Sequence, residues 1–310
     1  MRQLRACAAA FLTGMMASIA PASAEAQTCG SSAETAVQIL GSGGPIADDA
    51  RASSGYLVWH DGRAVALIDA GSGTFLRMGE AGARVNDLEF IGLSHFHTDH
   101  SADFPALIKS ASFSRRQHSL ILAGPDGTDR FPGVEEFVAR LFDGESGAYR
   151  YLSNDVADND APLIIREVAG DEVATVWDGD EITVQALHVP HGIVPALAFR
   201  VQAGDGVMVF GSDQNGSNAA FIALATDADL LVMHMVIPES ATGVASRLHA
   251  RPSRIGEIAH SASAGQLVLS HLMARSLRNL EANVSTIKER YTGIVTVAED
   301  LACFPLTGKE

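Results

Sequence analysis

Four side chains of the kind that bind metal ions stand close together in this chain of 310 residues: His95, His97, Asp99 and His100. Burying so many imidazole and carboxylate groups is costly unless each has a partner, and a cation would partner all of them. If the His-x-His stretch is extended, both imidazoles point the same way, while Asp99 and His100 turn towards a neighbouring point. The spacing therefore predicts two metal ions side by side.

The elements on either side of this cluster predict how it is held. Residues 88–93 are apolar enough for a short buried strand. Residues 101–113 have helical spacing, with Ser101 as a candidate N-cap. The cluster then occupies a strand-to-helix loop, which is the usual place for chemistry in an α/β fold.

Further potential ligands follow other apolar runs. Each has an ordinary explanation when taken alone, because aspartate is common in turns and histidine often caps or fills a core. Their combination with the loop is much less ordinary, because the chain has only 11 histidines and six of them lie in the loop or at strand ends. These further candidates are Asp213, His271, and the neighbouring pair His188 and His191.

The rest of the chain alternates between short apolar runs and helical patterns, in the order strands, helices, strands, helices. Two sheets with helices on their outer faces satisfy that order, so we predict a four-layer αββα sandwich of the α/β (α+β) class in one domain, residues 25–310. The expected strands are 36–40, 55–60, 64–70, 163–168, 181–188, 197–201, 206–210, 230–234, 267–270 and 293–297, and the expected helices are 74–82, 101–113, 133–142, 218–225, 252–263 and 277–289.

These motifs resemble those of metallo-β-lactamase-fold hydrolases, and within that superfamily the ribonuclease Z and arylsulfatase-like branch. The most specific match is the metal motif at 94–100. The segment 191–200 resembles the third metal-ligand segment, which selects His191 over His188. Residues 211–213 and 270–272 match the fourth and fifth ligand segments, and further signatures of the branch are resembled at 40–45, 51–54, 69–74 and 123–128.

The resemblance implies seven ligands shared by two metal ions. The first ion would be bound by His95, His97 and His191, the second by Asp99, His100 and His271, and both by Asp213. Nitrogen and carboxylate ligands without thiolate suit two Zn²⁺ ions, and Mn²⁺ or Fe²⁺ are compatible with the same set. The ions would lower the pKa of a shared water and polarise the scissile group.

Other residues are expected to assist these ligands. Asp99 would also be catalytic, by orienting the hydroxide. Asp69, Ser94 and Asp103 are candidates to orient the ligands, with turn or helix-cap duty as the alternative. His249 is a candidate general acid, with a helix-cap role as its alternative.

The chain departs from ribonuclease Z in two places. Those enzymes pair a glutamate after the strand that corresponds to 230–234 with a downstream histidine. His249 matches that histidine, but His234 and Met235 stand at the glutamate position, and no acid follows until Glu239. The segment 143–162 is also too short and polar for the long arm that grips transfer RNA. The first difference argues against the same leaving-group proton relay, and the second argues against transfer RNA as the substrate.

The charge of the chain supports the same preference. The net charge is −15, and a protein that binds a long polyanion usually carries a basic face. Residues 1–24 read as a secretory signal, with a basic start, an apolar run too short for a comfortable membrane span, and an A-x-A cleavage site. We therefore expect a periplasmic or secreted protein with no membrane contact after cleavage; an uncleaved anchor is the alternative.

Two cysteines remain after residue 24, Cys29 and Cys303, near opposite ends of the chain. An oxidising compartment would allow a disulfide that joins the two terminal segments, and two free buried thiols are the alternative.

The sequence predicts an exported dinuclear zinc hydrolase that acts on a small ester-like substrate. A phosphodiester or an aryl sulfate or phosphate ester comes first, and a β-lactam or lactone ring second, since one hydroxide attacks them all. A non-catalytic metal-binding protein on the same fold is the alternative from another class. A homodimer is compatible with the branch, although no feature of the sequence shows it.

Overall fold

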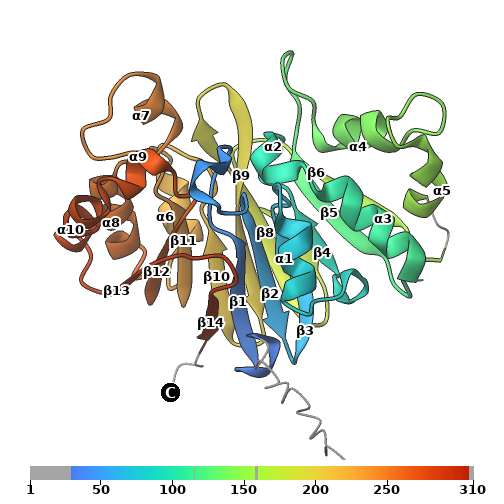
Figure 1. Ribbon diagram of the computed structural model, residues 1–310, viewed down its shortest axis with the longest axis horizontal. Coiled ribbons are helices and arrows are strands. Elements are labelled where there is room, and N and C mark those ends of the chain that lie inside the picture. The colour runs from blue at the N-terminus through green and yellow to red at the C-terminus, as the bar shows by residue number, and fades with distance from the viewer. Residues whose placement is uncertain (1–28, 115, 158–159, 307–310) are drawn as a thin grey trace, which may run out of the picture.

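Two seven-stranded β-sheets pack face to face, with helices on the outer face of each (Figure 1). This arrangement is seen in a computed structural model that describes residues 29–114, 116–157 and 160–306. It confirms the predicted αββα sandwich. The proposed signal at residues 1–24 lies outside the described residues.

The first sheet is antiparallel in its N-terminal part and parallel beyond it. Strands β14, β1, β2 and β3 pair antiparallel, whereas β3, β4, β5 and β6 run parallel. In spatial order the strands are β14 (Cys303–Leu306), β1 (Thr35–Gly41), β2 (Gly55–His60), β3 (Arg63–Ile68), β4 (Phe90–Gly92), β5 (Leu120–Pro125) and β6 (Leu163–Val168).

The second sheet repeats this mixture in mirror order. Strands β13, β12, β11 and β10 run parallel, and β10, β9, β8 and β7 pair antiparallel. The order is β13 (Ile294–Val297), β12 (Gln266–Ser270), β11 (Leu230–His234), β10 (Gly206–Phe210), β9 (Val194–Ala203), β8 (Ile182–His191) and β7 (Ala174–Asp178). Because neighbouring parallel strands end at the same edge, residues that follow them are brought together.

The helices divide between the two outer faces. The longer ones are α1 (Thr74–Glu80), α3 (Phe104–Ser114) and α4 (Val134–Phe142) on the first sheet, and α6 (Ala219–Leu224), α8 (Pro252–Ser261) and α10 (Leu280–Lys288) on the second. The short ones are α2 (Thr98–Ser101), α5 (Ser153–Val156), α7 (Val244–Leu248) and α9 (Ala274–Leu277), with 3₁₀ turns at Cys29–Ser31, Ala47–Asp49, Val85–Asp87 and Arg150–Leu152.

Three apolar layers hold the sandwich together. Phe90, Phe199 and Phe210 lie in the layer between the sheets, and one further layer lies under each set of helices. Burial of such side chains is the main favourable contribution to folding. Among the described residues, no helix is long and apolar enough to cross a membrane.

The structure corrects three details of the sequence prediction. Strands β5, β7 and β14 were not expected, and β14 rather than residues 293–297 ends the second half of the chain. The helix expected at 101–113 begins at Thr98 and breaks before Phe104. Pro105 has no N–H to continue the ladder of the preceding turn. Ser101 is therefore inside a helix, where its hydroxyl donates to the His97 carbonyl at 3.0 Å, and is not an N-cap.

A disulfide joins Cys29 to Cys303, 274 positions further along the chain. It links the first described turn to β14, which pairs with β1, so both terminal segments are fixed to the same edge of the first sheet. The cysteine pair is thus disulfide-bonded, as the sequence favours.

Replacing both cysteines with serine is expected to lower the free energy of unfolding by about 2–5 kcal/mol, because the open chain gains conformational entropy when unfolded. Urea unfolding under non-reducing conditions measures the loss. Reductant should reproduce it in the natural chain and leave the double variant unchanged. An unchanged unfolding midpoint in the double variant would contradict a stabilising role for the bond.

Candidate metal centre

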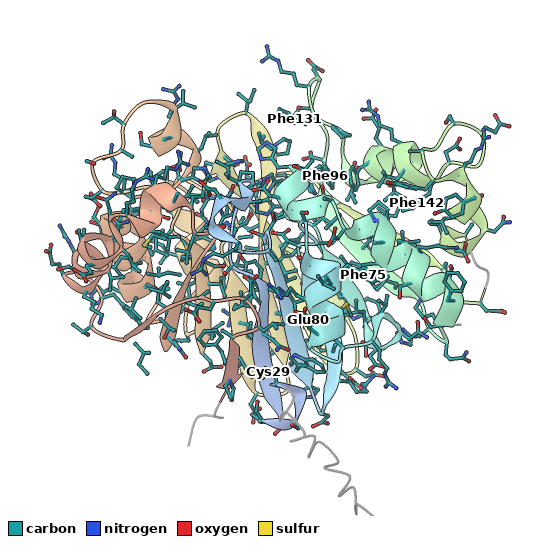
Figure 2. All side chains as sticks on the ribbon, viewed as in Figure 1. Cys29, Phe75, Glu80, Phe96, Phe131 and Phe142 are labelled. Atoms are coloured by element: carbon teal, nitrogen blue, oxygen red, sulfur yellow. A yellow bond between two sulfur atoms is a disulfide. The ribbon has the colours of Figure 1, made fainter. Side chains whose placement is uncertain are left out.

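The candidate ligands meet at one edge of the sandwich, where strands of both sheets end. The loop after β4 carries the His-x-His motif, and His191, Asp213 and His271 are at or just after the ends of β8, β10 and β12. In Figure 1 this edge is the upper one, next to α2. The disulfide lies at the opposite end, as the labels of Phe96 and Cys29 show in Figure 2.

The first group of ligands consists of three imidazoles. Nε2 of His95 lies 3.0 Å from Nδ1 of His97, and the ring of His191 lies 5.1 Å from that of His95 and 5.4 Å from that of His97. One nitrogen from each ring fits within a sphere that a single ion could share. The extended backbone of His97 lets both rings of the motif face the same point, as the alternation predicts.

The second group combines imidazoles with carboxylates. Nε2 of His271 lies 3.2 Å from Nε2 of His100 and 3.1 Å from Oδ2 of Asp99. Oδ2 of Asp213 lies 3.8 Å from His100 and 3.7 Å from His191, so this carboxylate stands between the two groups. That is the position of a bridging ligand.

The hydrogen bonds of the imidazoles test whether this donor set fits a metal. Nδ1 of His100 lies 2.7 Å from Oδ2 of Asp69, and Nδ1 of His191 lies 3.0 Å from the Leu248 carbonyl. Since the Leu248 carbonyl fixes the proton of the neutral His191 ring on Nδ1, Nε2 of His191 presents a lone pair towards Asp213. Nε2 of His100 and Nε2 of His271 lie only 3.2 Å apart, and the buried Nδ1 of His271 has no hydrogen-bond partner among the described residues. A shared cation satisfies that arrangement, so the residues fit a metal.

Asp69 orients His100, a ligand of the second group, through the 2.7 Å contact to Nδ1. Besides His100 it accepts from the backbone N–H of Ser94 at 2.7 Å and from the Ser94 hydroxyl at 2.9 Å. The same hydroxyl lies 3.1 Å from Nδ1 of His95. Asp69 and Ser94 therefore contact ligands of both groups. Asp103 does not, because its Oδ2 accepts from the N–H groups of Gly73 and Phe75 at the start of α1, both at 2.9 Å.

The backbone around the site is strained. Asp69, Ser212 and His271 follow strands with φ of 59°, 57° and 53°, a left-handed region that costs a non-glycine residue about 1–3 kcal/mol. Close packing holds them there: a Cβ on Gly44 would stand 2.7 Å from the His271 ring, and one on Gly71 would strike the Asp99 backbone. The fold thus stores strain at the residues that aim the ligands.

Burial and charge set the protonation of the ligands. Burial lowers the pKa of His95 well below its usual value, and lowers those of His97 and His191. Burial would raise the pKa of Asp99, but the hydrogen bond to His271 and the charge of His100 bring it to about 2. Imidazoles that stay neutral and carboxylates that stay ionised are the forms that bind metal.

His100 behaves differently. Burial would lower its pKa, but the Asp69 carboxylate at 2.7 Å and the charges of Asp213 and Asp99 raise it to about 9. Metal binding at the second group therefore has to displace a proton from His100 at neutral pH, which makes affinity there fall as pH falls.

The ligands open into a pocket of about 490 Å³. Asp99, Asp213, His97, His191 and His271 form its floor. The remaining lining residues are Pro45, Phe96, Thr98, Leu248, His249, Met273 and Arg275. This volume lies within the range of small-molecule sites.

Comparison with known proteins agrees with this geometry. A family model described as the metallo-beta-lactamase superfamily matches residues 48–226. The chain belongs to the metallo-β-lactamase superfamily. Members of this family are metal-dependent hydrolases, and the chain is an enzyme of that kind.

Individual relatives refine the placement. A curated protein named ribonuclease Z from Mycobacterium sp. (strain KMS) is 31% identical over 249 residues, covering 76% of this chain and 84% of the relative. The metallo-beta-lactamase fold protein YhfI from Bacillus subtilis has a TM-score of 0.67 at 23% identity, covering 87% of this chain and 98% of that one. The short form of human tRNase Z also gives 0.67, at 19% identity, covering 88% and 99%. At these identities the two structures show the fold alone.

His234 contacts the metal-ligand cluster of this superfamily member, a role that the sequence analysis did not predict. It ends β11 and is buried, with Nδ1 2.8 Å from Oδ1 of Asp213 and Nε2 2.8 Å from the Tyr56 hydroxyl. Burial lowers the pKa of His234 to about 4, so the ring is neutral and donates to Asp213. Because protein groups occupy both ring nitrogens, His234 orients the bridging carboxylate. Its sequence signals were its place at the end of an apolar strand and its match to the position of the ribonuclease Z glutamate.

Replacing His234 with phenylalanine keeps a ring in the site but removes the donor to Asp213. Loss of a group that orients a metal ligand typically weakens metal affinity by about 10–100-fold. Competition with a chromogenic zinc chelator measures the change. Tyr56→Phe removes the hydroxyl contacts to His234 and Ser270 but keeps the donor to Asp213, and should have a smaller effect. Equal affinity in His234→Phe and the natural chain would mean that Asp213 is positioned without the His234 contact.

His249, the predicted general acid, lines the pocket at the end of α7. Its Nδ1 lies 3.5 Å from Oδ1 of Asp213, and its ring lies 5.3 Å from His191 and 6.2 Å from His271. The buried Nδ1 has no hydrogen-bond partner among the described residues. This side chain lines the pocket beside Asp213, and its catalytic role stays a prediction.

His188 is not part of the cluster. Its Nε2 lies 2.9 Å from the Val168 carbonyl and 3.3 Å from Asp126. The two histidines of β8 therefore separate: His191 faces the ligands and His188 joins the sheets.

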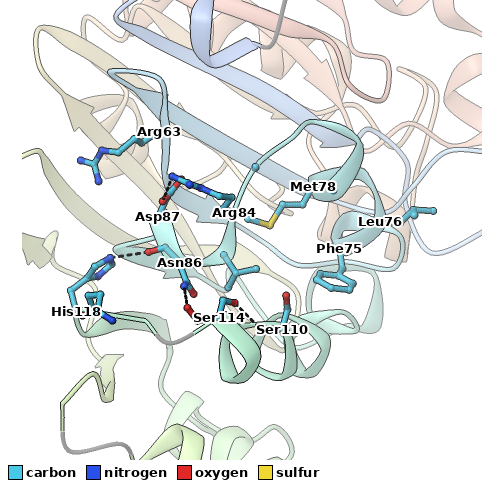
Figure 3. A pocket seen from close by; sticks show the side chains of 14 residues that line it. Arg63, Phe75, Leu76, Met78, Arg84, Asn86, Asp87, Ser110, Ser114 and His118 are labelled. Atoms are coloured by element: carbon cyan, nitrogen blue, oxygen red, sulfur yellow. Dashed lines mark hydrogen bonds and ion pairs between the residues drawn. The ribbon is translucent and has the colours of Figure 1, made fainter. Parts of the chain in front are cut away.

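A larger hollow, of about 790 Å³, lies away from the ligands between α1 and α3 (Figure 3). Its polar groups are mutually paired: Arg84 binds Asp87 through two 3.0 Å contacts, and the Asn86 side chain donates to the Ser114 carbonyl. Nε2 of His118 lies 2.9 Å from the Asn86 carbonyl. These pairings leave no converging reactive groups, so the chemistry belongs to the metal pocket.

Proposed function

We propose that the chain is an exported dinuclear zinc hydrolase of small ester-like substrates, with phosphodiesters or aryl sulfate or phosphate esters preferred. The observation that carries this proposal is that the two ligand groups lie side by side, and that members of both groups, His97, His191, Asp99 and His271, line one pocket of about 490 Å³.

The residues present suit two zinc ions. His95, His97 and His191 would hold one, and Asp99, His100 and His271 the other, with Asp213 between them. Bound zinc supplies Lewis acidity and acidifies water at neutral pH. The chain adds orientation: Asp99, ionised and beside His271, accepts a hydrogen bond from the attacking water. His249 faces the same pocket, where it donates a proton to the oxygen that leaves.

Size and charge support a small substrate. The pocket suits a molecule rather than a polymer, and the net charge of −15 opposes general binding to a polyanion. The similarity to proteins named ribonuclease Z makes RNA the competing substrate class, and it is tested directly below.

Export is proposed from the signal-like residues 1–24 and receives support from the Cys29–Cys303 disulfide, since such bonds persist in oxidising compartments. We expect a periplasmic or secreted protein. Sequencing the N-terminus from the periplasmic fraction should find it directly after Ala24 or Ala26; an intact Met1 there would contradict cleavage.

The test combines metal analysis with a substrate screen. The chain from residue 25 is assayed for zinc, manganese and iron, and then with bis-p-nitrophenyl phosphate, p-nitrophenyl sulfate, a chromogenic cephalosporin, a lactone and a precursor transfer RNA. About two zinc per chain and preferred turnover of the first two substrates are expected.

Each other outcome has a definite meaning. Preference for the ring substrates would support a β-lactam or lactone hydrolase, and preference for the RNA a ribonuclease. Two bound metals without turnover would support a metal-binding protein. Absence of metal would overturn the proposal.

A further inference from the structure

Arg275 is the one lysine or arginine among the described residues that line the metal pocket. It belongs to α9, four positions after the ligand His271, and is partly buried. Its position, its partners and the charge around it all point to a ligand.

The guanidinium is held in place without being neutralised. Nε donates to the Val236 carbonyl at 3.0 Å, and Nη2 lies 3.8 Å from the Met273 sulfur. Among the described residues no carboxylate lies within 4.0 Å of it, and Nη1 has no hydrogen-bond partner. The neutral contacts aim the group but leave its charge and several donors uncompensated.

Several other arginines are paired with a carboxylate, whereas the guanidinium groups of Arg51 and Arg200, like that of Arg275, are partly buried and donate to neutral acceptors. Arg63 pairs with Glu181, Arg84 with Asp87, and Arg140 with Glu136. A chain with 37 acidic residues against 22 basic ones offers many partners, yet Arg275 has none where solvent is partly excluded. Of these three unpaired arginines, Arg275 lines the metal pocket, where a bound anion can supply the counter-ion.

The pocket around Arg275 defines what that ligand carries. Pro45, Phe96 and Leu248 give the walls an apolar character. When two divalent ions are bound, their four positive charges exceed the two of Asp99 and Asp213, so the floor is positive as well. An anion with an aryl or alkyl substituent fits both parts. The planar guanidinium binds the paired oxygens of phosphate or sulfate through two parallel hydrogen bonds.

We propose that Arg275 is the specificity-determining residue of this pocket, and that it binds a non-bridging oxygen of an anionic oxyester, either a phosphodiester or a sulfate monoester. This proposal rests on the proposed function, whose preferred substrates it explains. Arg275 holds the anionic group while the ester oxygen faces His249, and neutral esters gain nothing from it.

The first test measures binding rather than turnover. Phenylphosphonate, an aryl anion with no ester bond to cleave, is titrated by calorimetry into zinc-loaded protein. In Arg275→Met its affinity should fall by about 10–100-fold, with the metal content and the melting temperature unchanged, because a charge-assisted hydrogen bond is lost. Arg278→Met, three positions on and exposed, removes the same charge and should change the affinity less than about threefold.

The second test compares substrates in the same variants. Arg275→Met should lower kcat/KM by about 10–100-fold for bis-p-nitrophenyl phosphate or p-nitrophenyl sulfate, and by less than about threefold for neutral p-nitrophenyl acetate. Arg275→Lys, which keeps the charge but not the fork, should lie between them. The anionic ester whose kcat/KM falls more in Arg275→Met shows whether Arg275 recognises a phosphodiester or a sulfate ester.

The outcomes separate this proposal from the proposed function. An equal loss on anionic and neutral esters, or unchanged phenylphosphonate affinity, overturns the role of Arg275 while the hydrolase stands. Phenylphosphonate binding that depends on Arg275, in a protein that hydrolyses none of the esters, supports the anion site and overturns the proposed reaction.

Discussion

Asp213→Ala is expected to lower kcat/KM for the preferred ester by about 10³-fold or more, and to reduce the bound zinc from two ions per chain to one or fewer. Within the described part of the chain, Asp213 is the carboxylate that lies within 4.0 Å of ligands of both groups, at 3.7 Å from His191 and 3.8 Å from His100. Its removal therefore affects both ions, whereas loss of a terminal ligand affects one.

The electrostatics of the site strengthen this expectation. Burial would raise the pKa of Asp213, but the neighbouring charges of His271 and His249 and the hydrogen bond from His234 bring it well below the usual range. The carboxylate is thus held ionised among imidazoles that are packed to receive a cation. Alanine removes the negative charge and leaves Nδ1 of His234 without its acceptor, which costs about 1–3 kcal/mol in a buried site.

The measurement is zinc content by mass spectrometry, with steady-state kinetics and circular dichroism on the same samples. Asp126→Ala is the matched control: it removes a carboxylate that contacts a β8 histidine at 3.3 Å outside the ligand cluster. It should change kcat/KM by less than about threefold. Full zinc content in Asp213→Ala would show that Asp213 is not the bridge.

Most ligands of this metal centre can be predicted from the sequence because they belong to short local motifs. His95, His97, Asp99 and His100 stand in one loop, and the apolar runs before Asp213 and His271 mark the strands that carry them. Parallel strands deliver such residues to one edge whatever lies between them. The αββα class was predicted separately, from the order of apolar runs and helical patterns along the whole chain.

What the sequence did not reveal depends on contacts between distant segments. The pairing of Tyr56 with His234 spans 178 positions, and each residue alone resembles an ordinary core residue. Strand β14 is four residues long and is defined by its partner β1 and the disulfide rather than by its own pattern. Asp103 resembled a ligand-orienting acid, yet two N–H groups of α1 take its carboxylate. In each case a tertiary contact decides the role.

The choice between His188 and His191 as the metal ligand depends on both local sequence spacing and contacts between distant segments. Three positions apart on an extended strand, the two side chains point to opposite faces. Spacing alone does not say which face meets the metal motif. The structure places Nε2 of His191 beside Asp213 and Nε2 of His188 beside the Val168 carbonyl. A single substitution at each position therefore separates a ligand from a neighbour of the same chemistry.

We expect His191→Ala to lose one zinc ion and to lower kcat/KM by about 10²–10³-fold, because the first group keeps only His95 and His97 and several kcal/mol of transition-state stabilisation disappear. His188→Ala should retain both ions and lower kcat/KM by less than about threefold, with a loss of about 1 kcal/mol in stability from its hydrogen bond to Val168. Zinc content and urea unfolding of the two variants distinguish these effects. If His188→Ala lost zinc while His191→Ala retained it, the third ligand of the first group would be His188. Strand β8 would then have to pair in a different register, with His188 facing His95 and His97.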